Sequence, residues 1–234
     1  MDFVSGEIII VDKPYGWTSF DAVKKVRGAI QRRLGLKKFK VGHAGTLDPL
    51  ATGVLIICTG RATKQIETLQ SGEKEYVATL RLGATTPSFD LETEIDSEYP
   101  YTHITREGIL EVLPRFTGRI MQVPPVFSAV KVDGKRAYKF ARKGAEVELK
   151  AKPLEIRELE LLEFEGNRMV IRVVCSKGTY IRALARDLGE ALESGAHLTD
   201  LRRTRVGNFD QKQALSVDAA VEMIGTCEIE ENVD

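Results

Sequence analysis

The chain has 234 residues, of which 43% are hydrophobic and 29% charged, and its 34 basic residues balance its 34 acidic ones. This composition is that of a globular protein with one large domain or two small ones. No apolar run approaches the roughly 20 residues of a membrane-spanning helix, and no signal peptide is expected from residues 1–6. The three cysteines lack metal-ligand spacing, so we expect buried thiols in a reducing cytoplasm and no metal site.

The first part of the chain alternates between strand and helix signals. Residues 7–11 form an apolar run typical of a short strand. Thr18 or Ser19 is expected to cap a helix, and Asp21 follows Thr18 at the spacing of a weak capping box. The apolar residues of this helix recur at helical spacing, at Phe20, Val23, Val26, Ile30 and Leu34.

Further elements follow from the same patterns. We expect a buried strand over 54–58, a helix over 61–69, an alternating strand over 76–82 and a helix over 105–113 closed by Pro114. The acidic stretch 87–102 between them predicts a mobile loop. Asp133-Gly134 is a hairpin-type turn signal.

Alternating residues 155–164 and 169–175 are joined at Gly166-Asn167 and predict a long hairpin. Residues 180–192 predict a helix, and Ser216 is expected to cap a last short one. Strands and helices mix without a regular βαβ repeat, and several strands are linked by hairpins. We therefore expect an α+β fold with a mostly antiparallel sheet.

The charges are unevenly distributed. Residues 22–47 carry eight basic residues and no acid, and residues 131–143 carry six basic residues against Asp133. Arg202, Arg203 and Arg205 form a third basic cluster, whereas acids gather in 90–98 and after Lys212. Such clusters are either a basic face for RNA or ordinary solvated surfaces, and we favour the RNA face.

Residues 41–55 form the most informative segment of the chain. Asp48 lies in a loop rich in glycine and threonine, before the apolar run 54–58, and it precedes a proline that favours extended backbone. Glycines on both sides allow a ligand to approach the backbone closely. From residue types alone, this loop is either a turn whose Asp caps its own backbone or a site that presents a carboxylate to a substrate.

The order of residues in this loop resembles the catalytic motif of the TruB family of pseudouridine synthases. Five other segments match blocks of that family in the same order along the chain. The six segments are 12–19, 42–53, 74–76, 122–131, 177–182 and 197–204. Because these six segments occur in the family's order along most of the chain, the chain is identified as a member of that family.

The resemblance implies a pseudouridine synthase fold: α+β, with a central mixed, mostly antiparallel sheet flanked by helices and a thumb-like insertion at about 124–152. It places the catalytic domain at residues 1–212. Residues 213–234 are then a short acidic helix and tail, because a full RNA-binding PUA domain cannot fit there.

The implied reaction isomerises uridine 55 in the T-arm of tRNA, without a cofactor, metal or guide RNA, in a cytoplasmic enzyme expected to be a monomer. By resemblance, Asp48 is the catalytic carboxylate that attacks or stabilises the sugar or the base, and Arg182 is its cationic partner. Tyr76 stacks on the flipped base, and its hydroxyl can assist proton transfer. Tyr180 and Leu201 line the pocket, while His43 stacks in the disrupted T-loop. Lys13 and Pro14 match a supporting motif, with contact between Lys13 and a phosphate as an alternative.

RNA is expected to be held through its backbone. The expected phosphate contacts are Lys131, Arg136, Lys139, Arg142, Lys143 and Arg202. Without the resemblance, Tyr76 reads as an ordinary strand aromatic, Leu201 as core and Arg182 as a surface helix residue.

Three other functions stay open. The guide-dependent branch of the same family depends on its PUA domain and partner proteins. A non-catalytic RNA-binding or RNA-folding module would not require Asp48, Tyr76, Tyr180 and Arg182 together. A hydrolase is disfavoured because no second carboxylate accompanies Asp48.

Overall fold

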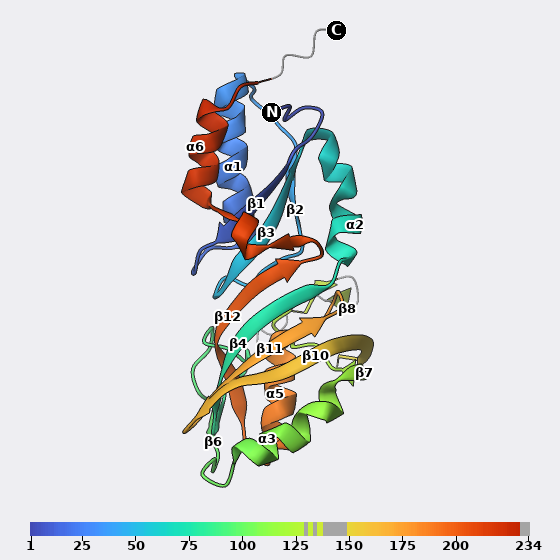
Figure 1. Ribbon diagram of the computed structural model, residues 1–234, viewed down its shortest axis with the longest axis vertical. Helices are drawn as coiled ribbons and strands as arrows, with labels where there is room; N and C mark the ends of the chain where they lie inside the picture. Colours follow the sequence, from blue (N-terminus) through green and yellow to red (C-terminus); the bar gives the residue numbers. More distant parts are fainter. Residues whose placement is uncertain (129–130, 133–134, 138–148, 230–234) are drawn as a thin grey trace. The chain divides into compact units, whose positions relative to one another are not determined.

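The computed structural model of this chain describes residues 1–128, 131–132, 135–137 and 149–229 (Figure 1). The chain forms two compact units, one made of Met1–Glu75 with Arg202–Asp234 and the other of Tyr76–Leu201. We call them unit 1 and unit 2. Both boundaries fall inside strands, namely β4 (Lys74–Leu82) and β12 (Ala196–Val206).

Unit 1 is a sheet with helices on both faces. Its strands lie in the order β14-β1-β3-β12, with β2 beside β3 and β13 beside β12. Strand β1 pairs with β3 in antiparallel and with β14 in parallel orientation, so the sheet is mixed. The elements are β1 (Ile8–Lys13), α1 (Ser19–Leu34), β2 (Val41–Ala44), β3 (Ala51–Thr59), η1 (Gly60–Gln65), α2 (Ile66–Ser71), β13 (Phe209–Asp210), η3 (Gln211–Gln213), β14 (Leu215–Ser216) and α6 (Val217–Thr226).

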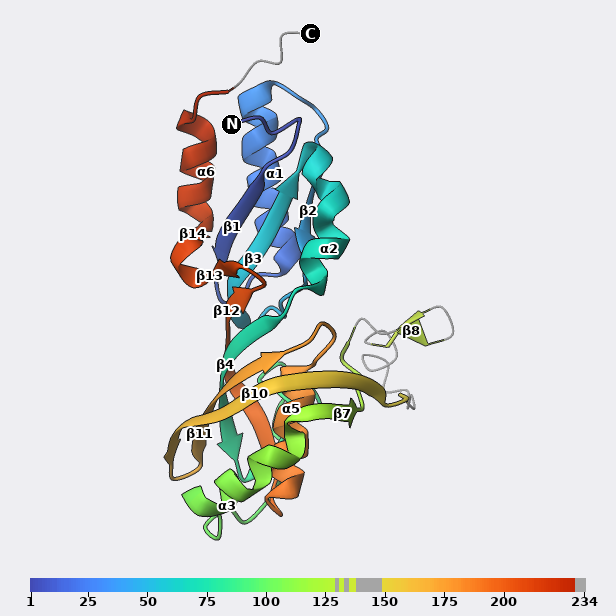
Figure 2. The same ribbon diagram turned by 45° about the vertical axis from the view of Figure 1, so that its right-hand side comes forward.

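Apolar residues on both sides of β1 and β3 explain why this sheet is covered twice. Ile9 and Val11 pack with α1 and α6, whereas Ile10 and Ile56 pack in a second cluster with residues of η1 and α2. Figure 2 shows α1 and α6 on one face of these strands and α2 on the other. An uninterrupted apolar run is the pattern expected of a strand buried on both faces.

The predicted start of α1 is confirmed. Thr18 accepts a hydrogen bond from the Asp21 N–H, and the Asp21 carboxylate accepts one from the Thr18 N–H, which completes a capping box. The prediction that Phe20 belongs to the buried stripe is wrong, because its side chain is 57% exposed. The predicted Val23, Val26 and Ile30 are buried, together with Ser19, Ala22 and Ala29, and Phe20 lies about 120° away from the centre of this stripe at 3.6 residues per turn.

Unit 2 has a sheet in the order β12-β4-β11-β10-β7. Strands β10 and β11 form the predicted long hairpin, and β8 pairs with β9 across the predicted turn at 133–134, which lies outside the described residues. Helix α5 buries Leu184 and Leu188, as predicted. Besides β4 and β12, the elements of unit 2 are β5 (Ala84–Thr85), β6 (Ser97–Glu98), α3 (Arg106–Val112), η2 (Leu113–Phe116), β7 (Gly118–Gln122), β8 (Lys131–Val132), β9 (Lys135–Arg136), β10 (Lys152–Glu165), β11 (Arg168–Cys175) and α5 (Ile181–Ala191).

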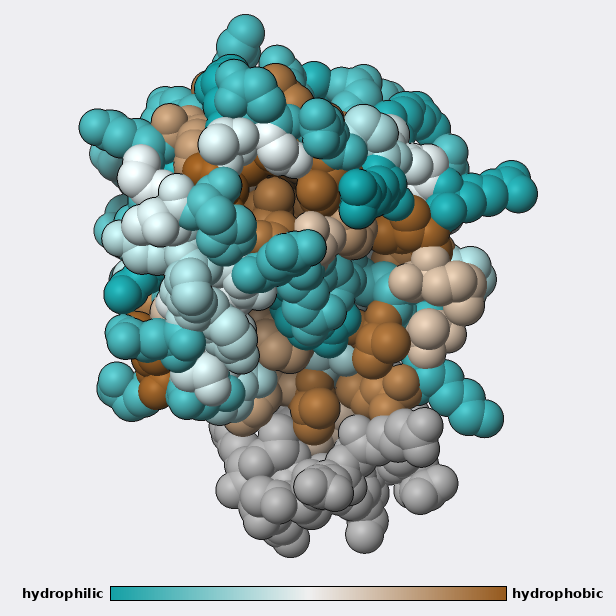
Figure 3. Space-filling model, turned by 90° about the horizontal axis from the view of Figure 1, so that it is seen from below, coloured by the Kyte–Doolittle hydropathy of each residue, from teal (hydrophilic) through white to brown (hydrophobic). Residues whose placement is uncertain are grey.

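Two features of unit 2 differ from the sequence predictions. No strand was expected over 196–201, where β12 begins. The acidic stretch 87–102 was expected to be mobile, but hydrogen bonds organise its turns: the Thr86 and Ser88 hydroxyls both donate to the Asp90 carbonyl. Ser88 and Asp90 are buried. Seen from below, where α3 lies, the surface is largely hydrophilic with hydrophobic areas between (Figure 3).

No helix in the described part of the chain is long and apolar enough to cross a membrane. The cysteines Cys58 and Cys175 are buried and Cys227 is half-buried. Burial raises the pKa of the Cys58 thiol to about 11. This thiol is therefore protonated at neutral pH, as expected of a cysteine that packs rather than reacts.

Candidate active site

The predicted site residues belong to both units. Asp48 and His43 lie in unit 1, whereas Tyr76, Tyr180, Arg182 and Leu201 lie in unit 2. The pairing of Asp48 with Arg182 therefore stays a prediction from the sequence. Within each unit, the contacts of these residues are well defined.

The loop between β2 and β3 carries a half-buried Asp48 and is held from outside by side chains and backbone of the β1–α1 region. The buried Ser19 hydroxyl accepts from the Leu47 N–H at 2.8 Å and donates to the Leu47 carbonyl at 3.1 Å. On the other side of Asp48, the Pro49 carbonyl accepts from the Gly16 N–H at 2.9 Å and from Lys13 Nζ at 3.2 Å. The residues before and after the carboxylate are thus both fixed.

Arg203 of β12 holds the beginning of the same loop. Its side chain is 1% exposed and donates to the carbonyls of Gly45 at 3.0 Å, Thr46 at 3.5 Å and Val54 at 2.8 Å. A buried guanidinium needs such acceptors, because an unsatisfied buried donor costs about 1–3 kcal/mol and more when it is charged. Arg203 therefore ties both ends of the Asp48 loop to one strand.

Glycine is required at one point of this arrangement. Gly53 has a φ of 103°, and a Cβ built on it would lie 2.2 Å from the Arg203 carbonyl oxygen. Any side chain would push the backbones of β3 and β12 apart and would also strain the dihedral angles. Gly53 thus allows Arg203 to approach the loop.

Lys13 is buried completely, and its ammonium donates to the carbonyls of Pro14, Trp17 and Pro49. All its donors have acceptors within the protein, which favours the supporting role over contact with a phosphate. Burial lowers the pKa of Lys13 to about 8; the Asp48 carboxylate opposes this shift and the Arg203 charge adds to it. The same Arg203 charge, after burial, lowers the pKa of His43.

Lys13 should give the stability of the chain a distinctive dependence on pH. Its pKa in the folded state, about 8, lies below the ordinary lysine pKa of 10.5, so between these values the unfolded state binds more protons. The free energy of unfolding is therefore expected to rise with pH in this window, by roughly 1–3 kcal/mol from this residue. Below this window Lys13 is protonated in both the folded and the unfolded state, so it makes no pH-dependent contribution to stability. Urea unfolding of wild type and Lys13→Met at pH 7 and pH 10 measures this contribution as the change in their difference.

Exposed Lys24→Met serves as the control for the loss of a lysine. If the difference between wild type and Lys13→Met were the same at both pH values, the lowered pKa of Lys13 would be wrong.

His43 lies in β2 and is half-buried. Its Nδ1 atom is buried and has no hydrogen-bond partner among the described residues. A buried polar atom without a hydrogen-bond partner is uncommon in a folded protein. With its lowered pKa, the ring is neutral at pH 7, which suits contact with a ligand better than proton transfer from an imidazolium.

In unit 2, Arg182 is a buried residue of α5 and not a surface one, with 4% of its side chain exposed. It donates to the carbonyls of Ser88 at 3.2 Å and Phe127 at 2.9 Å, and its Nε lies 3.6 Å from the Asp90 carboxylate. The sequence predicted that Asp90 lies in a mobile acidic loop, residues 87–102. Instead, it is a buried partner of a predicted catalytic residue, so Arg182 also holds unit 2 together.

Tyr180 is the residue before α5 and is positioned by Gln122. The Tyr180 N–H donates to Gln122 Oε1 at 2.9 Å, and Gln122 Nε2 donates to the Tyr180 carbonyl at 3.2 Å. Gln122 is buried, and neither it nor Ser19, Asp90 or Arg203 was identified from the sequence. The only signal was that Gln122, Ser19 and Arg203 lie within the blocks that resemble the family.

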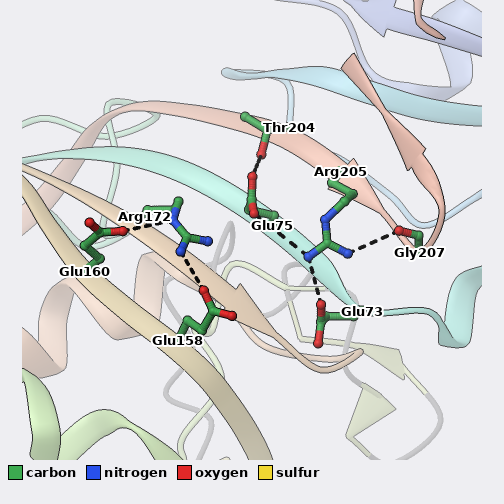
Figure 4. A network of polar contacts seen from close by, with 8 residues as sticks. All are labelled: Glu73, Glu75, Glu158, Glu160, Arg172, Thr204, Arg205 and Gly207. Atoms are coloured by element: carbon green, nitrogen blue, oxygen red, sulfur yellow. Dashed lines mark hydrogen bonds and ion pairs between the residues drawn. The ribbon is translucent and has the colours of Figure 1, made fainter. Parts of the chain in front are cut away.

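Tyr76 is buried in β4, in an alternating pattern as predicted, and Leu201 is buried in β12. The residues flanking them are strongly paired within unit 1. Thr204 donates to Glu75 at 2.7 Å, and Arg205 donates to Glu73 at 2.8 Å and to the Gly207 carbonyl at 3.2 Å (Figure 4). Figure 4 also shows Arg172 of unit 2 bound by Glu158 and Glu160 across the β10–β11 hairpin.

These contacts change the interpretation of the third basic cluster. Arg203 is buried, Arg205 is paired with Glu73, and Arg202 forms an ion pair with Asp12 at 2.7 Å. A role for Arg202 as a phosphate contact stays a prediction, since it would compete with Asp12. The side chains of Lys131 and Arg136, and the whole of Lys139, Arg142 and Lys143, lie outside the described residues.

Two protein-family domains match consecutive parts of this chain. Residues 31–181 match the N-terminal domain of the TruB family pseudouridylate synthases, and residues 182–231 match the tRNA pseudouridylate synthase B C-terminal domain. The chain is 65% identical over 234 residues to a Phocaeicola vulgatus protein named tRNA pseudouridine synthase B, with 100% of both chains covered. A Bacteroides thetaiotaomicron protein of the same name is 63% identical over 238 residues, covering 100% of this chain and 99% of that protein.

Among solved structures, the chain resembles one from a crystal structure of a Cbf5-Nop10-Gar1 complex, with a TM-score of 0.71 and 32% sequence identity. The match covers 95% of this chain and 55% of that one, so the chain spans about half its length.

The sheet, the domain matches and the relatives define an enzyme of the pseudouridine synthase class, which is an isomerase. Within that class, the chain belongs to the TruB family. The predicted α+β fold with a mixed, mostly antiparallel sheet and flanking helices is confirmed. The domain division at residue 212 and the extent of the insertion at 124–152 stay predictions.

Proposed function

We propose that this chain converts uridine 55 in the T-arm of tRNA into pseudouridine, as a cytoplasmic monomer and without a guide RNA. The observation that carries the proposal is the identity of 65% over the full length of a protein named tRNA pseudouridine synthase B. The Asp48 loop supports it, because a carboxylate on a backbone fixed on both sides is what a positioned nucleophile needs.

The reaction cleaves the N-glycosidic bond between the sugar and N1 of the base, rotates the base, and rejoins it to the sugar through carbon. The nucleotide keeps its atomic composition. The base carbon that forms the new bond releases a proton, and the N1 atom freed from the sugar takes one up. A stacked uridine has to be flipped out first, at a cost of a few kcal/mol. We assign the nucleophile to Asp48, base stacking to Tyr76, and the pocket wall to Tyr180 and Leu201.

Arg182 is proposed to stabilise the anionic form of Asp48, and His43 to contact the opened loop of the RNA. The buried His43 Nδ1, which has no partner among the described residues, supports the latter role. Of the proposed RNA backbone contacts, Lys131, Arg136, Lys139, Arg142 and Lys143 would lie on the thumb-like insertion, and Arg202 on β12.

Incubation of the purified chain with an unmodified tRNA transcript tests the proposal. Pseudouridine is mapped by base-specific chemical modification and primer extension. A single stop in the T-loop is expected, and it should vanish in a transcript with cytidine at position 55. Tight binding of the transcript without a stop would exclude this reaction and favour an RNA-binding module.

A guide-dependent enzyme is the second candidate, since the solved relatives include the structure of an H/ACA RNP bound to a substrate RNA. The same assay separates the two candidates. Modification of the transcript by the chain alone excludes a need for guide RNA, whereas modification that requires an added guide RNA and partner proteins would support it.

A further inference from the structure

The exposed side of α1 carries an open groove of about 780 Å³. It starts at the β1–α1 connection and follows the helix for most of its length. The residues that define its chemistry are Trp17, Asp21, Lys24, Lys25, Arg27 and Arg32.

The groove is strongly basic. Lys24, Lys25, Arg27 and Arg32 face a single lining acid, Asp21, which already accepts hydrogen bonds from Thr18 in the capping box. In the described part of the chain, the ion pair of these four cations joins Lys25 to Asp218 at 3.7 Å on the exposed surface, and such a pair is worth little. The arginines of β12 donate to acids and carbonyls that stabilise the fold. Among the residues that the structure describes, the cations of the groove have no comparable structural contacts.

The groove begins beside the Asp48 loop. The Gly16 N–H donates to the Pro49 carbonyl at 2.9 Å, and Lys13 Nζ bridges the carbonyls of Trp17 and Pro49. The end of the groove formed by Gly16 and Trp17 is therefore hydrogen-bonded to the residue that follows Asp48. A ligand that reaches Asp48 over this side must pass the groove.

Aromatic side chains accompany the cations. Tyr15 and Phe20 are 56% and 57% exposed, and the Arg27 guanidinium lies 5.6 Å from the centre of the Phe20 ring. Exposed aromatic rings among cations are typical of surfaces that bind nucleic acid, and an acidic peptide would not need them. From Lys24 to Arg32 the helix rises about 12 Å, enough for several successive phosphates.

We propose that this groove binds the sugar-phosphate backbone of the substrate RNA next to the target nucleotide. The inference rests on the proposed function in that RNA is the ligand. It adds a second contact surface, on α1 of unit 1, to the thumb-like insertion of unit 2. Lys24, Arg27 and Arg32 make the phosphate contacts, independently of the base sequence.

A triple variant Lys24→Gln/Arg27→Gln/Arg32→Gln tests the groove, and Lys37→Gln/Lys38→Gln/Lys40→Gln is the matched control. Both remove three exposed or half-exposed cations of the same segment, but only the first set lines the groove. Glutamine keeps the helix propensity of lysine and arginine. Circular dichroism and melting temperature establish that both variants fold.

Binding to a fluorescent, unmodified tRNA transcript is measured by anisotropy at several salt concentrations. For the groove variant, we expect an increase in Kd of about tenfold or more at low salt. The slope of log affinity against log salt concentration should become less negative by roughly two to three, because each lost phosphate contact accounts for about 0.7–0.9 of the slope. The control variant should change the slope by less than one.

Equal changes in the two variants would overturn the proposal, since they would show a general charge effect. The test is separate from that of the proposed function, because it measures binding. A wild type that binds tRNA but forms no pseudouridine would refute the reaction and leave the groove to be judged by the salt slopes.

Discussion

An Asp48→Asn variant is expected to bind unmodified tRNA as tightly as the wild type and to form no pseudouridine. The amide has nearly the shape of the carboxylate, and the contacts that fix the loop involve the backbone of Leu47, Pro49 and Gly45. The loop should therefore keep its conformation. An amide cannot act as the nucleophile, so turnover should fall on the order of 10⁴-fold or more.

Single-turnover experiments with enzyme in excess measure this loss without interference from product release. Glu67→Gln, which removes an exposed acid of the same unit, is the control for net charge. Residual activity within a hundredfold of the wild type would show that Asp48 is not the nucleophile. Loss of tRNA binding together with turnover would point to a structural role for this residue.

An Arg203→Met variant is expected to lower kcat on the order of 10²-fold while changing the Kd for tRNA only a few-fold. It leaves the carbonyls of Gly45, Thr46 and Val54 without their donor, so the Asp48 loop is released at both ends. Displacement of a catalytic group by about 1 Å can cost a factor of this size. Arg203 acts here as a positioning residue, because its contacts are to the loop.

Arg205→Met is the matched control. Arg205 lies two residues along β12, on the same face of the strand, but donates to Glu73 and Gly207 (Figure 4). Both variants should lose stability, whereas only Arg203→Met should lose kcat beyond what its melting temperature explains. Arg203→Lys should recover part of the activity, since an ammonium can still reach a carbonyl. Equal kcat values in the two methionine variants would remove Arg203 from the site.

The local elements of this protein could be predicted from the sequence because their signals lie within a few residues of one another. The capping box of Thr18 and Asp21, the apolar alternation of the β10–β11 hairpin and the leucines of α5 are examples. The Asp48 loop was identified for the same reason, since its glycines and its acid are contiguous. Its role, however, followed from the family resemblance and not from residue types.

The missed features depend on contacts between distant segments. The part of β12 around Arg203 is rich in charges and resembles a surface segment, because the carbonyls that accept from Arg203 lie far away in the sequence. Asp90 was misassigned likewise, since its partner Arg182 lies on α5. Phe20 fitted the helical spacing but not the centre of the stripe, which only packing against α6 and the sheet defines.

The connection between Arg203 and Gly45 has a consequence for how the chain matures on the ribosome. These residues are 158 positions apart in sequence. At about 5–20 residues per second, the Asp48 loop emerges roughly 8–30 s before the strand that fixes it. A nascent or truncated chain that ends before β12 therefore carries the complete Asp48 loop without the side chain that supports it. The Asp48 loop acquires its final geometry only after β12 has been synthesised.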